Sequence, residues 1–224
     1  MKIQYASKFF CSILFGLFFS LNTIGQVSSV KYDLINLFDN NKFEVFNRKL
    51  SPFSEKEMRG VRFSKSNGDG IAWINGVEFS NGIIELDIRG KDVMQQSFVG
   101  IAFHGVNNET LDAIYFRPFN FRSTDPVRKI HAVQYISHPD YTWQVLREQH
   151  NGDYEKEITP APDGNDWFHA RIVVLYPKVT VFVNGNSEPS LVVDQLNERN
   201  TGKIGLWVGN TSDGDFANLQ ITNK

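Results

Sequence analysis

From about residue 60 onward the chain is a series of short β-type segments separated by clusters of Gly, Asn, Asp and Pro. The segment Ile83–Arg89 alternates strictly, with Ile84, Leu86 and Ile88 on one face and charged residues on the other. Such alternation predicts a strand with one face in a core and one in water. No segment keeps helical apolar spacing over four turns. The pattern therefore predicts an all-β chain and disfavours a parallel βαβ architecture.

About a dozen strands are predicted in this way. They are Gly60–Ser64, Gly70–Ile74, Ile83–Arg89, Phe98–His104, Ala113–Phe121, Ala132–Ser137, Trp143–Arg147, Phe168–Tyr176, Val179–Asn184, Ser190–Val193, Lys203–Gly209 and Phe216–Ile221. The segment Asn36–Glu57 is compatible with one short helix or a further strand. This number of strands, without an internal repeat, predicts a two-sheet antiparallel β-sandwich of jelly-roll type.

One hairpin is predicted in more detail than the rest. Two Val-rich segments flank Pro177–Lys178, which predicts an antiparallel pair joined by a tight turn. Asn184 and Gly185 tolerate positive φ, and they predict a second turn at the far end of this pair.

The N-terminus has the composition of a signal peptide. Lys2 and Lys8 precede an uncharged apolar run at 9–19, which is too short to span a bilayer. Thr23 and Gly25 are the small residues expected before a cleavage site at Gln26. We expect a signal peptide at 1–25, a single jelly-roll domain at 26–224, a secreted or periplasmic location and no membrane span in the mature protein. A retained membrane anchor is the alternative.

Charge and cysteine content exclude several classes of protein. The formal net charge is −2, and loss of Lys2 and Lys8 with the signal peptide makes it −4, so no nucleic-acid partner is expected. The single cysteine, Cys11, lies in the apolar run, which excludes disulfides and cysteine-ligated metals from the mature chain.

No cofactor is predicted from the sequence. Asp69, and Asp213 with Asp215, are acids of the kind found at calcium sites, and Ca²⁺ is the alternative that they leave open. Neither has the further ligand spacing of a known calcium loop. Turn chemistry explains them more simply.

Several segments together carry a family resemblance. They are Gly82–Arg89, Phe98–Phe103, Trp167–Ile172, Val181–Gly185, Gly202–Trp207 and Phe216–Ile221. The chain resembles concanavalin A-like and laminin-G-like jelly rolls over about residues 60–222, and it is most similar to secreted bacterial 3-keto-disaccharide hydrolase-like domains. The resemblance implies a glycan-related role in a secreted protein. It transfers no catalytic residue.

The stretch 115–150 differs from the rest of the chain because arginines and aromatic residues alternate there. Such a mixture suits saccharides, above all acidic ones, since guanidinium groups pair with carboxylate or sulfate and rings stack on sugar C–H faces. Trp207, between Gly205 and Gly209, is a further stacking candidate. The ordinary alternative is core packing and solvated loops. The candidate ligand-binding residues are Tyr115, Arg117, Gln134, Tyr135, His138, Trp143, Arg147 and Trp207.

Three functions stay open at this stage. The first is a carbohydrate-binding or carbohydrate-processing domain. The second is a glycoside hydrolase or polysaccharide lyase: Glu85 and Asp87 share a strand face as a hydrolase pair would, although solvent-face charges paired with Arg89 explain them more simply. A lyase would use Arg117, Gln134, Tyr135 and His138, yet Tyr135 lies on the face opposite to Gln134 and His138. The third is a non-catalytic laminin-G-like interaction domain.

Overall fold

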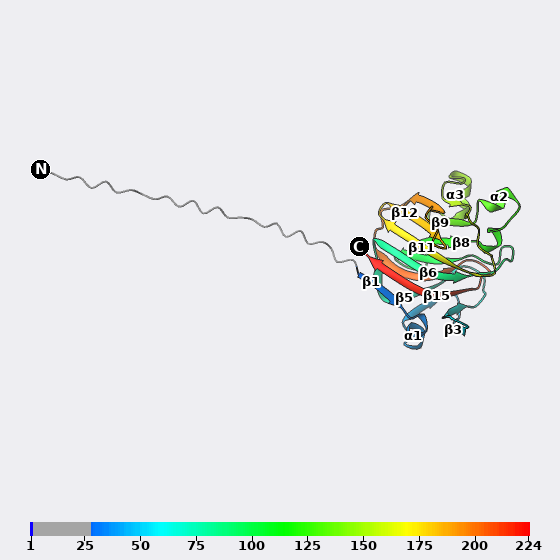
Figure 1. Cartoon of the computed structure of the whole chain (residues 1–224), viewed down its shortest axis with the longest axis horizontal. Helices are drawn as coiled ribbons and strands as arrows, with labels where there is room; N and C mark the ends of the chain where they lie inside the picture. Colours follow the sequence, from blue (N-terminus) through cyan, green and yellow to red (C-terminus); the bar gives the residue numbers. More distant parts are fainter. Residues whose placement is uncertain (2–27) are drawn as a thin grey trace.

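The structure, a computed structural model, describes Met1 and residues 28–224. In this part of the chain two antiparallel sheets pack face to face, as Figure 1 shows, and the predicted β-sandwich is confirmed. Apart from Met1, the predicted signal peptide at 1–25 and its cleavage before Gln26 lie outside the described residues. Within residues 28–224 no helix has the length and apolar character needed to cross a membrane.

The first sheet, called sheet A, has eight strands. Seven run in the order β13, β12, β11, β6, β15, β4, β3, and β1 pairs with β15. Their bounds are β1 Ser28–Tyr32, β3 Leu50–Glu55, β4 Met58–Phe63, β6 Gly82–Arg89, β11 Trp167–Leu175, β12 Lys178–Val183, β13 Leu191–Asp194 and β15 Gly214–Asn223.

The second sheet, called sheet B, has seven strands in the order β10, β9, β8, β7, β14, β5, β2. Their bounds are β2 Phe43–Phe46, β5 Gly70–Phe79, β7 Val99–Gly105, β8 Leu111–Phe116, β9 Val133–His138, β10 Glu155–Lys156 and β14 Gly202–Val208. Short helices lie in the connections: α1 Leu34–Asp39, the 3-10 helix η1 Pro118–Asn120, α2 Pro126–Lys129 and α3 Trp143–Gln149.

The core between the sheets follows the predicted alternation. Ile84, Leu86 and Ile88 of β6 are fully buried in it. The β11–β12 hairpin pairs Ile172 with Val181 around the turn at Pro177, as predicted. Asn184 and the glycine after it have positive φ, so the predicted turn at the far end is also confirmed.

A second apolar layer covers the outer face of sheet B, on the side away from sheet A. It contains Trp73, Tyr115, Ile136, Leu146 and Trp207, all buried. Because side chains alternate along a strand, Tyr115 belongs to this outer layer while its neighbours Ile114 and Phe116 belong to the inner core. The outer layer carries the candidate site.

The strand predicted at Trp143–Arg147 is wrong, because this segment begins helix α3. Thr142 caps the helix by accepting a hydrogen bond from the Val145 main-chain N–H at 3.3 Å. The cap satisfies a main-chain donor that a strand would have paired elsewhere. Leu146 is the only buried residue of α3, so its packing leaves no periodic apolar stripe in the sequence.

Candidate functional site

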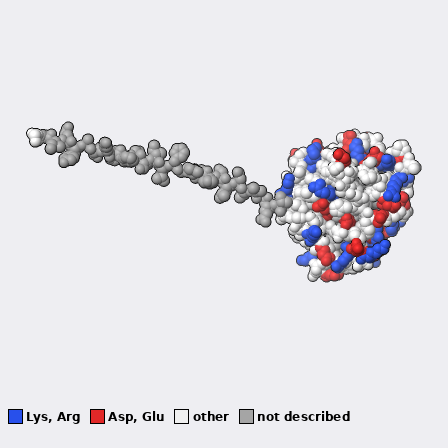
Figure 2. Space-filling model, in the orientation of Figure 1, with Lys and Arg blue, Asp and Glu red and all other residues white. Residues whose placement is uncertain are grey.

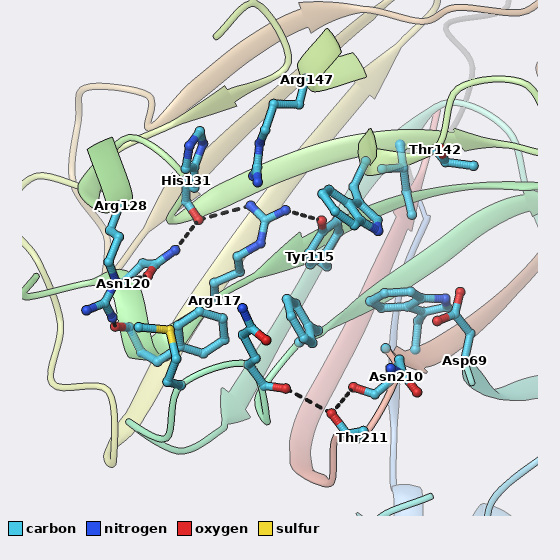
Figure 3. A pocket seen from close by; sticks show the side chains of 18 of the residues that line it. Asp69, Tyr115, Arg117, Asn120, Arg128, His131, Thr142, Arg147, Asn210 and Thr211 are labelled. Carbon is cyan, nitrogen blue, oxygen red and sulfur yellow. Dashed lines mark hydrogen bonds between the residues drawn. The ribbon is translucent and has the colours of Figure 1, made fainter. Parts of the chain in front are cut away.

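A pocket of about 690 Å³ opens on the outer face of sheet B. Tyr115 of β8 and Trp207 of β14 lie in its floor, and the connections around η1, α2 and α3 supply its walls. In Figure 3 Asp69 lies on one side of the pocket and Arg128 on the other, with Arg117 and Tyr115 between them.

Four aromatic rings form a continuous row along the pocket. The ring centroids of Trp207 and Tyr115 are 5.1 Å apart, those of Tyr115 and Phe98 are 6.2 Å apart, and those of Phe98 and Phe119 are 5.4 Å apart. A fifth ring, Trp143 of α3, is 48% exposed at the rim. Ring faces of this kind stack on sugar C–H groups or on other rings.

The basic wall of the pocket is organised by one buried carboxylate, Glu155, which is 2% exposed. Arg147 donates to it from Nε and Nη2 at 3.3 and 3.0 Å, and Arg117 donates from Nη1 at 3.3 Å. The His131 Nδ1 lies 2.8 Å from the same carboxylate. Burial lowers the pKa of His131, and Glu155 opposes this shift. Glu155 therefore compensates part of the positive charge that the sequence places here.

Arg117 is held almost entirely by the protein itself. It is 4% exposed and also donates to the His131 carbonyl oxygen at 3.0 Å, to the Tyr115 hydroxyl and to Gln134 Oε1. The Tyr115 hydroxyl donates to Gln134 Oε1 at 2.7 Å, and burial raises the pKa of Tyr115 to about 12. Arg117 thus fixes the Tyr115 ring in the pocket floor.

An acid and a base with displaced pKa values lie on the Asp69 side. Burial raises the pKa of Asp69, an effect that His138 and Arg48 oppose. Burial lowers the pKa of His138, and Asp69 opposes that shift. Both residues line the pocket, as does Trp207, whose Nε1 is buried without a hydrogen-bond partner among the described residues. An acid, a base and an indole ring thus line one cavity.

The structure brings most of the predicted ligand-binding residues together. Tyr115, Arg117, His138, Trp143, Arg147 and Trp207 line the pocket. Gln134 lies in the layer beneath it, bonded to Tyr115 and Arg117. Tyr135 is misplaced in the prediction, because it is fully buried in the core between the sheets, where its hydroxyl accepts from the Leu196 N–H at 3.4 Å. Strand alternation predicts this separation, because Tyr135 lies on the face of β9 opposite to Gln134 and His138.

Sequence analysis missed several residues of the pocket. Asp69 was considered only as a turn or calcium residue, and Arg128 only as part of the basic stretch. Met94 was not a candidate, since a single apolar residue in a connection has no pattern. Phe119 was assigned to the predicted strand Ala113–Phe121, but β8 ends at Phe116 and Phe119 lies in η1. Glu155 could not be recognised, because the sequence does not show that its carboxylate is buried among cations.

Glu85 and Asp87 lie on the opposite side of the molecule, on the outer face of sheet A. The Asp87 carboxylate is 2.8 Å from His169 Nδ1, and its hydrogen bond raises the pKa of His169. Glu85 lies 3.7 Å from His169 Nε2 and lines a separate groove of about 590 Å³. Both are partly exposed solvent-face residues, as expected. The predicted pairing with Arg89 is wrong, since Arg89 bonds Glu55 and Asp215 instead.

The acids considered for calcium have basic partners or line the pocket. Asp215 accepts hydrogen bonds from Arg62 and Arg89, and Asp213 pairs with Lys91. Among the described residues no three His, Cys, Asp or Glu side chains are grouped as metal ligands would be.

The sandwich and its outer-face pocket define the class of protein as a concanavalin A-like jelly roll. A family model described as a 3-keto-alpha-glucoside-1,2-lyase-like domain matches residues 33–222, and the chain belongs to this family. The predicted family resemblance is therefore confirmed. No curated protein matches the sequence.

Solved structures of low sequence identity share the fold. The carbohydrate-binding module CBM66 from Bacillus subtilis superposes with a TM-score of 0.59 at 14% identity, covering 80% of this chain and 95% of that one. A Bacillus subtilis protein of unknown function with a galectin-like fold has a TM-score of 0.58 at 10% identity, with coverages of 88% and 98%. A Bacillus licheniformis β-glucanase has a TM-score of 0.51 at 13% identity, with coverages of 88% and 98%.

Proposed function

We propose that the pocket on sheet B binds a glycoside oxidised to a ketone at C3 and cleaves it by elimination across C1 and C2. The observation that carries the proposal is that the half-buried Asp69 and His138 line the same pocket as Trp207, with the pKa values of the acid and the base both displaced. Perturbed acids and bases in one cavity are typical of sites that transfer protons. The family to which the chain belongs supports a lyase of this kind.

The reaction requires two contributions from the protein, which are proton transfer and charge stabilisation. The C3 ketone acidifies the C2 proton, a base removes that proton, a C1–C2 double bond forms, and the C1–O bond breaks to release the alcohol after protonation. Because burial lowers its pKa, His138 is neutral near pH 7 and can act as the base. The negative charge of Asp69 stabilises the imidazole once it is charged. The Trp207 ring, which lines the pocket, is a stacking surface for the sugar.

A hydrolase with two carboxyl groups is a weaker reading of the same pocket. Asp69 is the only Asp or Glu among the described residues that line it, and the usual hydrolytic mechanism needs two such groups.

Binding without reaction is the second candidate. It is favoured by one observation, the exposed Trp143 ring at the rim with the Arg147 guanidinium 5.2 Å from its centroid. Export from the cytoplasm is a further proposal, and it rests on the N-terminal apolar run alone.

The test is an elimination assay with methyl 3-keto-α-D-glucoside, in which ultraviolet absorbance reports the conjugated enone product. We expect His138→Asn to lower kcat by roughly 10²- to 10⁴-fold, the range usual for loss of a general base. The matched control is His150→Asn, since His150 is partly exposed and is not among the pocket-lining residues. If the native protein binds the keto-glucoside without turnover, the result supports binding without reaction instead of the lyase. Full activity in His138→Asn would contradict the assigned base.

A further inference from the structure

The pocket has room for more than one sugar ring, and its two sides present different chemical groups to a ligand. Its volume of about 690 Å³ is within the range of about 300–1,000 Å³ found for pockets that enclose drug-sized molecules. Figure 3 shows Asp69 on one side, and Asn120 with Arg128 on the other. A ligand that fills the pocket meets both sides.

The Asp69 side presents a carboxylate and an imidazole to a ligand. Trp207 is 4% exposed, and its Nε1 has no partner within residues 28–224. The Asp69 carboxylate and the His138 imidazole share this side. A ring rich in hydroxyl groups satisfies such atoms, because each buried polar group left unpaired costs free energy. The sugar therefore lies on this side.

On the Asn120 side most polar atoms of Asn120 and Arg128 are already bonded within the protein. Arg128 donates from Nε to Asn120 Oδ1 at 3.2 Å and from Nη2 to the Phe119 carbonyl oxygen at 2.6 Å. Asn120 Nδ2 donates to a main-chain carbonyl oxygen at 3.1 Å. Phe119 precedes Asn120 in η1, and its ring packs edge-on against that of Phe98. The side chain of Met94, which is 47% exposed, is a further apolar group of the pocket lining.

The aromatic row from Trp207 through Tyr115 and Phe98 to Phe119 connects the two sides without a break. A second sugar on the Asn120 side would bring hydroxyl groups to a surface whose polar partners are occupied. A flat apolar group would bury its faces against rings and a thioether, which attract aromatic carbon. We infer that the pocket is built for glycosides whose leaving group is an aromatic alcohol, seated between Met94 and Phe119. The inference rests on the proposed function for the orientation of the sugar.

The test measures binding by calorimetry with two unoxidised ligands, phenyl α-D-glucoside and methyl α-D-glucoside. We expect the phenyl glucoside to bind about tenfold more tightly to the native protein, which corresponds to about 1.4 kcal/mol. Met94→Ser should remove most of this advantage and leave the affinity for the methyl glucoside unchanged. The control is Val106→Ser, because Val106 is also an exposed apolar residue in a connection but does not line the pocket.

The outcomes separate this inference from the proposed function. Equal affinity for the two glucosides, or binding of neither, overturns the aromatic leaving group. A phenyl preference that Met94→Ser leaves intact overturns the assigned subsite. A phenyl preference that depends on Met94, in a protein that fails to turn over the 3-keto glucoside, supports the inference and contradicts the lyase. The binding assay needs no catalysis, so the two results are independent.

Discussion

Asp69 and His138 influence each other's protonation because both are half-buried and their charged forms attract. For His138, burial is the largest cause and lowers the pKa, whereas Asp69 and then Asp112 raise it. Asp69→Asn removes the nearest of these negative charges but keeps the imidazole buried. We therefore expect the pKa of His138 to fall further below its ordinary value, measured by NMR titration of the histidine ring.

A substitution far from the pair gives the control for this titration. Glu57→Gln removes a negative charge from an exposed residue in the turn between β3 and β4 of sheet A and should leave the pKa of His138 in place. A His138 pKa that rises or does not move in Asp69→Asn would show that the two groups are not coupled. The proton-transfer role of the pair would then lose its basis.

At the level of single residues, sequence predicts which side chains bind better than how they are bonded. The aromatic and basic types in 115–150 were recognisable, and six of the eight candidates line one pocket. The bonding state of Arg117 was not, because it depends on Glu155, 38 residues further along the chain. Asp69 was equally hidden, since only the folded sheet brings it near His138.

At the level of elements, strands were predicted correctly where alternation is strict. Helix α3 was not recognised, because only one of its side chains is buried. β6 and β11 alternate over seven or more residues, and both were predicted correctly as strands. Helix α3 has seven residues and one buried side chain, too few for a periodic signal. Its Trp and Val residues favour strands by propensity, and the Thr142 cap outweighs that preference.

Strand β11 offers a test of the sandwich core. Val174 is fully buried between the sheets, while the next residue, Leu175, is exposed on the opposite face. Val174→Asp would bury a charge without a partner, and we expect it to lower the free energy of unfolding by roughly 3 kcal/mol or more in urea titrations. Leu175→Asp introduces the same group into solvent and should change stability little. Equal effects of the two substitutions would place β11 outside the core.

On the scale of the whole molecule, the two-sheet architecture was predictable because the strand pattern extends through most of the chain. The family match begins at residue 33, well before the resemblance recognised from about residue 60. The earlier part contains α1 and the edge strands β2 and β3, which are short and mostly exposed. Edge elements with few buried residues give little signal, and this explains where the resemblance stopped.

The charge distribution of the molecule bears on the predicted preference for acidic glycans. Acidic and basic side chains are interspersed over the face in Figure 2, and the net charge of the chain is −2. Beneath the pocket lining, the buried Glu155 lies between Arg117 and Arg147, so these two cations are already paired. A bound carboxylate would have to compete with Glu155 for their hydrogen bonds. We therefore expect the pocket to prefer neutral ligands to the acidic ones that composition indicated.

This preference is testable with phenyl α-D-glucoside and the corresponding glucuronide. We expect the glucoside to bind the native protein with an affinity that changes less than about twofold between ~0.1 M and ~1 M salt, over which the Debye length falls from ~10 to ~3 Å. Glu155→Gln frees positive charge, so binding of the glucuronide should strengthen and become salt-dependent, while the glucoside responds little. If the native protein binds the glucuronide more tightly, with an affinity that salt weakens, the paired arginines still attract anions and the acidic-glycan prediction is restored.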